Sequence, residues 1–161
     1  MPNIKLATPT DIPIICQLAE KIWYEHYITI ITAEQIEYML TNFYSLQNLE
    51  KLMKEGQMFY LIQDETDNSI GYLAVTENQT GYWFMNKFYI KTDFQGKGVG
   101  AQILKQWEEL VKPDGISLQV NRKNYKSINF YFKNGFKIKA VADFDIGKGY
   151  SMDDFIMEKG Y

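Results

Sequence analysis

Residues 88–100 read Phe-Tyr-Ile-Lys-Thr-Asp-Phe-Gln-Gly-Lys-Gly-Val-Gly, and they join an aromatic, strand-like run to the start of a helical pattern. The alternate glycines Gly96, Gly98 and Gly100 favour a tight turn with uncovered backbone N–H groups. Such groups at a helix N-terminus bind anions, because the helix dipole places partial positive charge there, and Lys97 adds a full charge. The stretch therefore predicts a site for a phosphate or pyrophosphate group.

The composition indicates one soluble, folded domain over residues 1–161. Of these residues 46% are hydrophobic and 16% aromatic, which excludes a disordered chain, while the apolar runs are too short to span a bilayer. Cys16 is the only cysteine and gives no reason to expect an oxidising compartment. The net charge of −3 argues against a nucleic acid partner. We therefore expect a cytoplasmic protein without membrane or nucleic acid partners.

Hydrophobic periodicity predicts an α+β fold with a mixed central sheet. Thr32 and Gln35 have the spacing of a capping box at a helix start, and Asn124 and Gly135 bracket a later helix. The expected strands cover residues 4–6, 58–62, 70–75, 82–90, 116–120, 136–144 and 152–159. The expected helices cover residues 12–23, with Thr10 and Asp11 as the cap, and 33–43, 46–55, 99–111 and 125–134.

Two common phosphate motifs do not account for the glycine turn. The P-loop spacing Gly-x-x-x-x-Gly-Lys-Ser/Thr is absent. Residues 96–101 match the dinucleotide pattern Gly-x-Gly-x-x-Gly/Ala, but residues 119–121 (Gln-Val-Asn) stand where the ribose-binding acid belongs. The turn also follows a meander instead of opening a first βαβ unit. A different phosphate ligand is therefore indicated.

A second block, Asn-Tyr-Lys-Ser-Ile-Asn-Phe-Tyr-Phe-Lys-Asn-Gly-Phe at residues 124–136, follows the first. The two blocks together resemble the GNAT N-acetyltransferases, whose Arg/Gln-x-x-Gly-x-Gly/Ala motif is matched by Gln95, Gly98 and Gly100. The resemblance implies the GNAT acyl-CoA N-acyltransferase fold, a mixed central sheet with a splayed strand pair flanked by helices. It also implies direct transfer of an acetyl group from acetyl-CoA to a primary amine. Within this family, residues 23–39 and 145–157 most resemble the spermidine/spermine (polyamine) acetyltransferase-like branch.

The same resemblance assigns roles to individual residues. Tyr131 is expected to be the general acid that protonates the departing thiolate. Backbone groups of Phe88 and Ile90 would pair with the pantetheine amides as an added strand does, while their side chains stay in the core. The residues expected to contact acetyl-CoA are Phe88, Tyr89, Ile90, Gln95, Gly96, Lys97, Gly98, Val99, Gly100, Asn124, Ser127 and Tyr131.

The general base is where this chain departs from the family pattern. Asn86 stands where many relatives have a glutamate, and an asparagine does not accept a proton at neutral pH. Glu25, Glu77, His26 or a water chain would have to act instead, or the amine would have to arrive neutral. The pair at residues 153–154, Asp-Asp, is compatible with binding a second ammonium group or with simple solvation of a hairpin.

Several alternatives stay open at this point. The chain could acetylate a protein N-terminus or a lysine side chain instead of a small amine, or it could be an acyl-CoA-binding regulator without activity. Asn86 favours the regulator and Tyr131 argues against it. No metal-ligand cluster is evident in the sequence, so no metal is expected. The family resemblance suggests a homodimer.

Overall fold

The computed structural model describes all 161 residues and has the expected α+β architecture. Seven strands form one mixed sheet in the order β1-β2-β3-β4-β5-β7-β6. The strands are β1 (Asn3–Leu6), β2 (Met58–Gln63), β3 (Ser69–Gln79), β4 (Tyr82–Ile90), β5 (Gly115–Asn121), β6 (Lys137–Gly147) and β7 (Tyr150–Gly160). The helices are α1 (Ile12–Tyr27), α2 (Ala33–Phe43), α3 (Leu46–Lys54), α4 (Val99–Val111) and α5 (Tyr125–Lys133), with 3-10 turns η1 (Pro9–Asp11) and η2 (Thr92–Phe94).

The parallel pair β4 and β5 is splayed, as expected. Their ladder joins residues 82–85 of β4 to residues 115–118 of β5. Both strands continue beyond it, β4 to Ile90 and β5 to Asn121. The backbone of the last part of β4 is therefore not used in pairing with β5.

The chain divides into two compact units. The first consists of Met1–Thr76 and Lys87–Lys112, and the second of Glu77–Asn86 and Pro113–Tyr161. Each unit is described by itself below.

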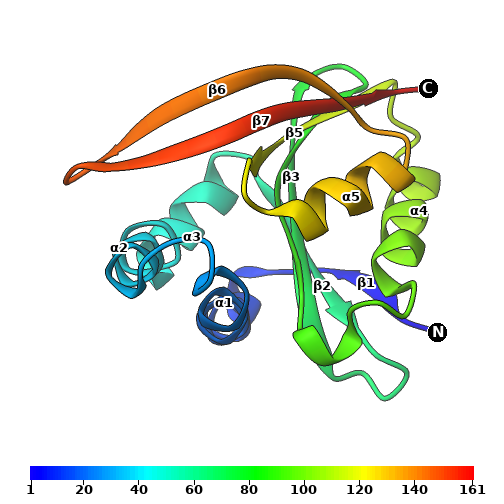
Figure 1. Cartoon of the computed structure of the whole chain (residues 1–161). Helices are drawn as coiled ribbons and strands as arrows, with labels where there is room; N and C mark the ends of the chain where they lie inside the picture. The colour runs from blue at the N-terminus through cyan, green and yellow to red at the C-terminus, as the bar shows by residue number, and fades with distance from the viewer. The chain divides into compact units, whose positions relative to one another are not determined.

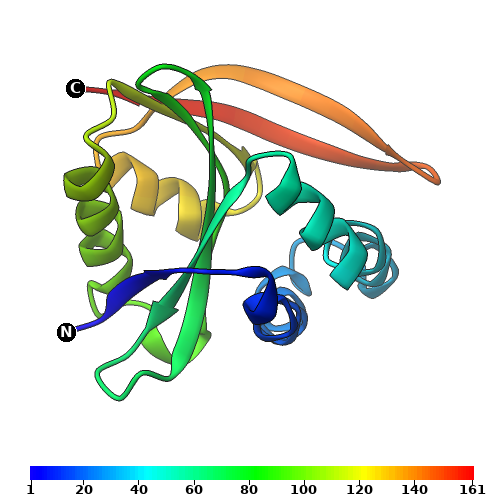
Figure 2. The ribbon, with the colours of Figure 1, turned by 180° about the vertical axis from the view of Figure 1, so that it is seen from behind.

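In the first unit, the antiparallel strands β1, β2 and β3 carry helices on both faces. Helices α1, α2 and α3 lie on one side of these strands and α4 lies on the other (Figures 1 and 2). On the α4 side, Ile62 and Ile70 of the strands pack with Val99 and Ile103 of α4, and Ile90 at the end of β4 joins them. Burial of these branched side chains holds the start of α4 against the sheet.

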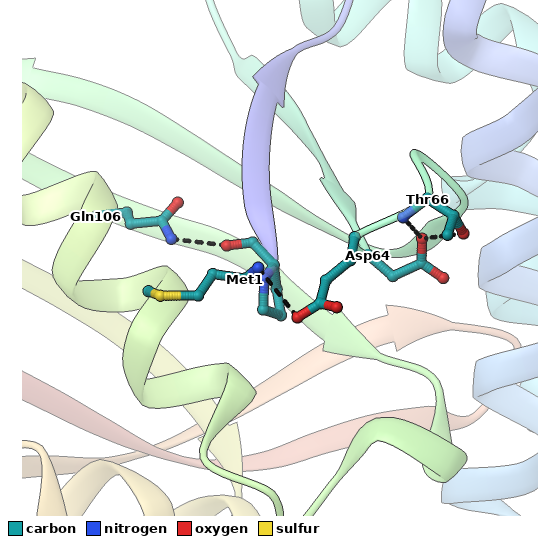
Figure 3. Close-up of polar contacts among 6 residues, drawn as sticks. Met1, Asp64, Thr66 and Gln106 are labelled. Atoms are coloured by element: carbon teal, nitrogen blue, oxygen red, sulfur yellow. Dashed lines mark hydrogen bonds and ion pairs between the residues drawn. The ribbon is translucent and has the colours of Figure 1, made fainter.

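The N-terminal strand is held by α4 and by the turn beside it. Gln106 of α4 donates a hydrogen bond of 2.8 Å from Nε2 to the carbonyl of Pro2, and the Met1 ammonium is 3.1 Å from Glu65 Oε1 (Figure 3). Between β2 and β3, Asp64 Oδ1 accepts a hydrogen bond from the backbone N–H of Thr66 (Figure 3) and another from that of Asn68, and the two bonds close the turn.

In the second unit, β7 lies between β5 and β6 in antiparallel register. Leu118 of β5 is opposite Met157 of β7, and Asn121 is opposite Asp154. Helix α5 runs along one face of these strands (Figures 1 and 2). Leu118 and Met157 are buried, whereas Gln119 and Glu158 beside them on the other face are exposed, so α5 covers the face of Leu118 and Met157.

Most element boundaries agree with the expectations, but α1 ends at Tyr27, four residues later than expected, and other differences follow. Asp11 begins α1 without a side-chain cap, because its carboxylate accepts a hydrogen bond from Thr8 N–H at the start of η1 instead. Strand β3 extends to Gln79, beyond the expected end at residue 75, and β6 and β7 are both longer than expected. No helix has the length and apolar character needed to cross a membrane, and the longest, α1, has 16 residues.

Candidate active site

The glycine turn in the first unit has the geometry of an anion site. Gly96 and Gly98 adopt positive φ angles of 73° and 78°, and Gly98 is the N-cap of α4. No side chain caps this helix, so the N–H groups of its first turn are available to a ligand. A Cβ atom built at either glycine would meet nothing within 4 Å, so the space before the turn is open. Lys97 is exposed between them.

The end of β4 is fixed to this turn by hydrogen bonds. Gln95 donates from Nε2 to the carbonyl of Ile90 at 2.8 Å, and Lys91 N–H donates to the carbonyl of Ile70 at 2.8 Å. Gly71 makes this approach possible, because a Cβ there would collide with the carbonyl of Tyr89. The Ile90 carbonyl, which we expected to be free for pantetheine, therefore already accepts a hydrogen bond from Gln95.

Successive β4 side chains point to opposite faces. Phe88 and Ile90 pack in the apolar core beside Val99, as expected for residues that would offer only their backbone to a ligand. Tyr89 lies on the other face, with its hydroxyl 3.1 Å from the Tyr27 hydroxyl of α1. The strand thus presents a tyrosine, and no carboxylate, toward α1.

In the second unit, Asn124 and Ser127 form the start of α5. The Asn124 side-chain oxygen accepts a hydrogen bond of 3.3 Å from Ser127 N–H, and Asn124 is buried. The predicted helix cap is therefore confirmed. The Asn124 carbonyl accepts a hydrogen bond of 3.0 Å from Ile128 N–H, which is the first hydrogen bond of the helix.

Tyr131 is held by the way α5 ends. Gly135 has a φ of 91°, and Phe136 N–H donates to the Tyr131 carbonyl at 3.0 Å while Gly135 N–H donates to the Phe132 carbonyl at 3.2 Å. This pair of bonds is a Schellman motif. The Tyr131 ring packs at 5.3 Å, centroid to centroid, against Phe130 and against Phe136, and the side chain is buried.

Asn86, at the position of the family glutamate, and the candidate general bases all contact other groups of the protein. Asn86 donates from Nδ2 to the Phe84 carbonyl at 3.4 Å, a bond within its own strand. Glu77 accepts from Gly81 N–H at 2.9 Å and so stabilises the β3–β4 turn. Glu25 accepts from the Thr92 hydroxyl at 3.1 Å, and the His26 ring stacks edge-on at 4.8 Å from Tyr27.

Sequence reasoning missed a half-buried lysine on β4, Lys87. Lys87 donates from Nζ to Gln57 Oε1 at 2.7 Å and lies 5.6 Å and 5.3 Å from the ring centroids of Tyr44 and Phe59. Burial lowers the pKa of Lys87 to about 8. The signal was a lone lysine inside an otherwise apolar and aromatic strand.

Sequence reasoning also left the role of Asp154, on β7, open. The side chain is 0% exposed, whereas the neighbouring Asp153 is exposed and accepts a hydrogen bond from the Ser151 hydroxyl at 3.1 Å. Neither carboxylate oxygen of Asp154 has a hydrogen-bond partner. The two aspartates of the hairpin therefore differ, and only Asp153 fits simple solvation.

A mixed sheet with a splayed parallel pair, an uncapped helix behind a glycine turn, and a buried tyrosine on the following helix define an acyl-CoA-dependent transferase. The family described as "Acetyltransferase (GNAT) domain" matches residues 28–145. The chain belongs to this family and is an acetyl-CoA-dependent N-acetyltransferase. No group of three or more His, Cys, Asp or Glu side chains is placed to hold a metal ion.

Individual relatives agree with this class. A spermidine N(1)-acetyltransferase of Thermoplasma acidophilum is 28% identical over 173 residues, covering 99% of this chain and 97% of the relative. A peptidyl-lysine N-acetyltransferase, YjaB of Salmonella typhimurium, is 27% identical over 122 residues, covering 73% of this chain and 78% of the relative. The crystal structure of the PaiA N-acetyltransferase of Thermoplasma acidophilum, in complex with coenzyme A, superposes with a TM-score of 0.82 at 25% identity, covering 100% of this chain and 99% of that one.

Proposed function

We propose that this enzyme acetylates a primary amine of a polyamine such as spermidine. The open, uncapped turn at the start of α4 supports the acetyl-CoA part of the proposal, because it suits a pyrophosphate. The acceptor rests on one observation, the similarity to a spermidine acetyltransferase along nearly the full length of both chains.

The residues expected from the family motifs take the following roles in the proposal. Backbone N–H groups of residues 95–100 hold the pyrophosphate, and the exposed ammonium of Lys97 adds charge. Residues 88–90, Phe-Tyr-Ile, offer backbone groups to pantetheine, with the Ile90 carbonyl shared with Gln95. Asn124 and Ser127 contact the cosubstrate from the start of α5 while they keep their capping bond.

The reaction is a direct transfer. The neutral amine nitrogen attacks the thioester carbonyl carbon, a C–N bond forms, and the C–S bond breaks with its electron pair going to sulfur, while the nitrogen releases one proton to solvent. Tyr131 donates its hydroxyl proton to that sulfur and regains a proton from solvent. Its burial between Phe130 and Phe136 suits this role, because an apolar surrounding favours neutral thiol over thiolate.

A panel assay tests the acceptor. Purified enzyme with acetyl-CoA is offered spermidine, spermine, diamines, amino acids and lysine peptides, and free thiol is followed. Turnover on spermidine and spermine without turnover on peptides is expected. Peptide turnover alone would favour the second candidate, a peptidyl-lysine acetyltransferase, which the similarity to YjaB supports. Acetyl-CoA binding without turnover on any acceptor would favour a regulator.

We further propose that residues 1–161 act as one N-acetyltransferase domain in the cytoplasm, without nucleic acid or membrane partners, and as a homodimer. The family match across residues 28–145 includes parts of both units, which supports a single domain. The edge strand β6 exposes Ile138 and Val141, apolar side chains on one face of the strand that a second copy would cover. Light scattering after gel filtration should give twice the chain mass, and a monomer at all concentrations would contradict the dimer.

A further inference from the structure

Asp154 carries a buried carboxylate that the protein itself does not pair. The side chain is 0% exposed, and neither Oδ1 nor Oδ2 accepts a hydrogen bond. A buried carboxylate without a partner is costly, and it either takes up a proton or needs a cation. No donor within the protein therefore binds either oxygen of the Asp154 carboxylate.

The charged groups around Asp154 do not supply that donor. Arg122, in the connection after β5, directs Nη1 to Asp143 Oδ1 at 2.7 Å and to the backbone carbonyl of Asp154 at 3.2 Å. Burial raises the pKa of the Asp154 carboxyl to about 6 against the opposing charge of Arg122, and the carboxylates of Asp153 and Asp143 add to the rise. One guanidinium among three carboxylates leaves the neighbourhood acidic and suited to a cationic ligand.

The position of Asp154 relates it to the reaction. It pairs with Asn121, the last residue of β5, and the Asn121 carbonyl accepts from Asn124 N–H at 2.9 Å. Asn124 in turn caps the helix that carries Tyr131. Ligands bind near the carboxyl ends of parallel strands, and β5 is parallel to β4. Asp154 therefore lies beside the turn that positions both expected contacts of α5.

The strand pattern places Asp154 on the face opposite to α5. Leu118 and Met157, which are opposite each other in the register, lie on the face that α5 covers. Asn121 follows Leu118 by three residues and Asp154 precedes Met157 by three, so the side chains of Asn121 and Asp154 point to the other face. An acid on α5 and a carboxylate on the far face would approach a reacting thioester from two sides.

We propose that Asp154 binds the ammonium group of the acceptor amine and removes one proton from it before attack. The step transfers one proton from R–NH3+ to an Asp154 oxygen and leaves R–NH2. When the C–N bond forms and the C–S bond breaks, the nitrogen releases its second proton to solvent, and the sulfur gains a proton from Tyr131, which solvent then reprotonates. Asp154 returns its proton to solvent with the product. This inference rests on the proposed acetylation of a small amine, and it supplies the base that Asn86 lacks.

The test compares Asp154→Asn with Asp153→Asn in the full chain. At pH 7 the first variant should lower kcat/KM for spermidine about 100-fold, while the affinity for acetyl-CoA, measured by calorimetry, stays unchanged. Its remaining activity should rise about tenfold per pH unit, because free amine must then come from solution. Asp153→Asn should keep the wild-type profile, since its side chain is exposed.

An Asp154→Asn variant within about threefold of wild type, with the same pH profile, would overturn the proposal. If that variant does not fold, carbon NMR of the aspartate carboxyls in the wild-type complex with coenzyme A decides instead. Spermidine should lower the pKa of Asp154 by about one unit, and an unchanged titration would overturn the proposal. A wild-type enzyme that binds acetyl-CoA but acetylates no amine would instead refute the proposed function, and the NMR titration would then still show whether Asp154 binds an ammonium ion.

Discussion

Tyr131 is placed by the end of α5, so its hydroxyl can be removed with little change in structure. In Tyr131→Phe the Schellman bonds use only the backbone, and the ring contacts with Phe130 and Phe136 are kept. We expect kcat to fall about tenfold or more, because the thiolate then leaves without its acid. Steady-state kinetics measure this, and calorimetry should show unchanged acetyl-CoA affinity. Turnover equal to wild type would remove Tyr131 from the mechanism.

Asp154 should make folding stability depend on pH. Its pKa in the folded protein is about 6, above the value of 3.8 for a solvated carboxyl. Because the pKa is higher in the folded protein, protonation of Asp154 stabilises the folded state. This stabilisation is fully present below about pH 4 and is lost as the pH rises through 6. The loss amounts to about 3 kcal/mol at full ionisation. Because asparagine resembles the neutral acid, we expect Asp154→Asn to be more stable than wild type at pH 8 and similar at pH 4.

Urea unfolding at the two pH values measures this difference, and Asp153→Asn is the matched control because its side chain is exposed. Equal stability of Asp154→Asn and wild type at both pH values would contradict the unpaired burial of this carboxylate.

At the scale of elements, the role of Gly98 in the turn before α4 can be tested against Gly149, a glycine with the same backbone conformation elsewhere in the chain. Gly98 and Gly149 have φ angles of 78° and 77°, and a Cβ at either would meet nothing within 4 Å. Alanine should therefore strain the backbone equally, by about 1 kcal/mol at each site. Only Gly98→Ala should weaken acetyl-CoA binding, by about tenfold, because its methyl group stands before the N–H groups of the helix. Equal affinity of both variants, measured by calorimetry, would contradict the pyrophosphate site.

Much of the element pattern could be predicted because local signals determine it. The helix at residues 99–111 has the expected bounds, since a glycine turn begins it and Pro113 follows it closely. Thr32 caps α2 through Gln35 N–H at 3.1 Å, as the capping pattern indicated. The ends of β6 and β7 were missed, because their exposed polar residues lack alternation and are ordered only by pairing with each other.

At the scale of the molecule, the family could be predicted from two motifs, whereas burial could not. Asp154 is adjacent to Asp153 in the chain, and only the pairing of β7 between two strands makes one buried and the other exposed. Lys87 likewise lies beside Gln57 and the rings of Tyr44 and Phe59, which come 28 to 43 positions earlier in the chain. Such contacts depend on tertiary structure, so sequence reasoning left the acid–base chemistry on the acceptor side incomplete.

The proposed reaction transfers the acetyl group directly from acetyl-CoA to a small amine. The most direct measurement incubates the enzyme with acetyl-CoA labelled in the acetyl group and with spermidine, and identifies the product by mass spectrometry. We predict labelled monoacetylspermidine formed in equal amount to free coenzyme A, with no labelled protein. Release of coenzyme A without any acetylated amine, or label that stays on the enzyme, would contradict direct transfer to a small amine.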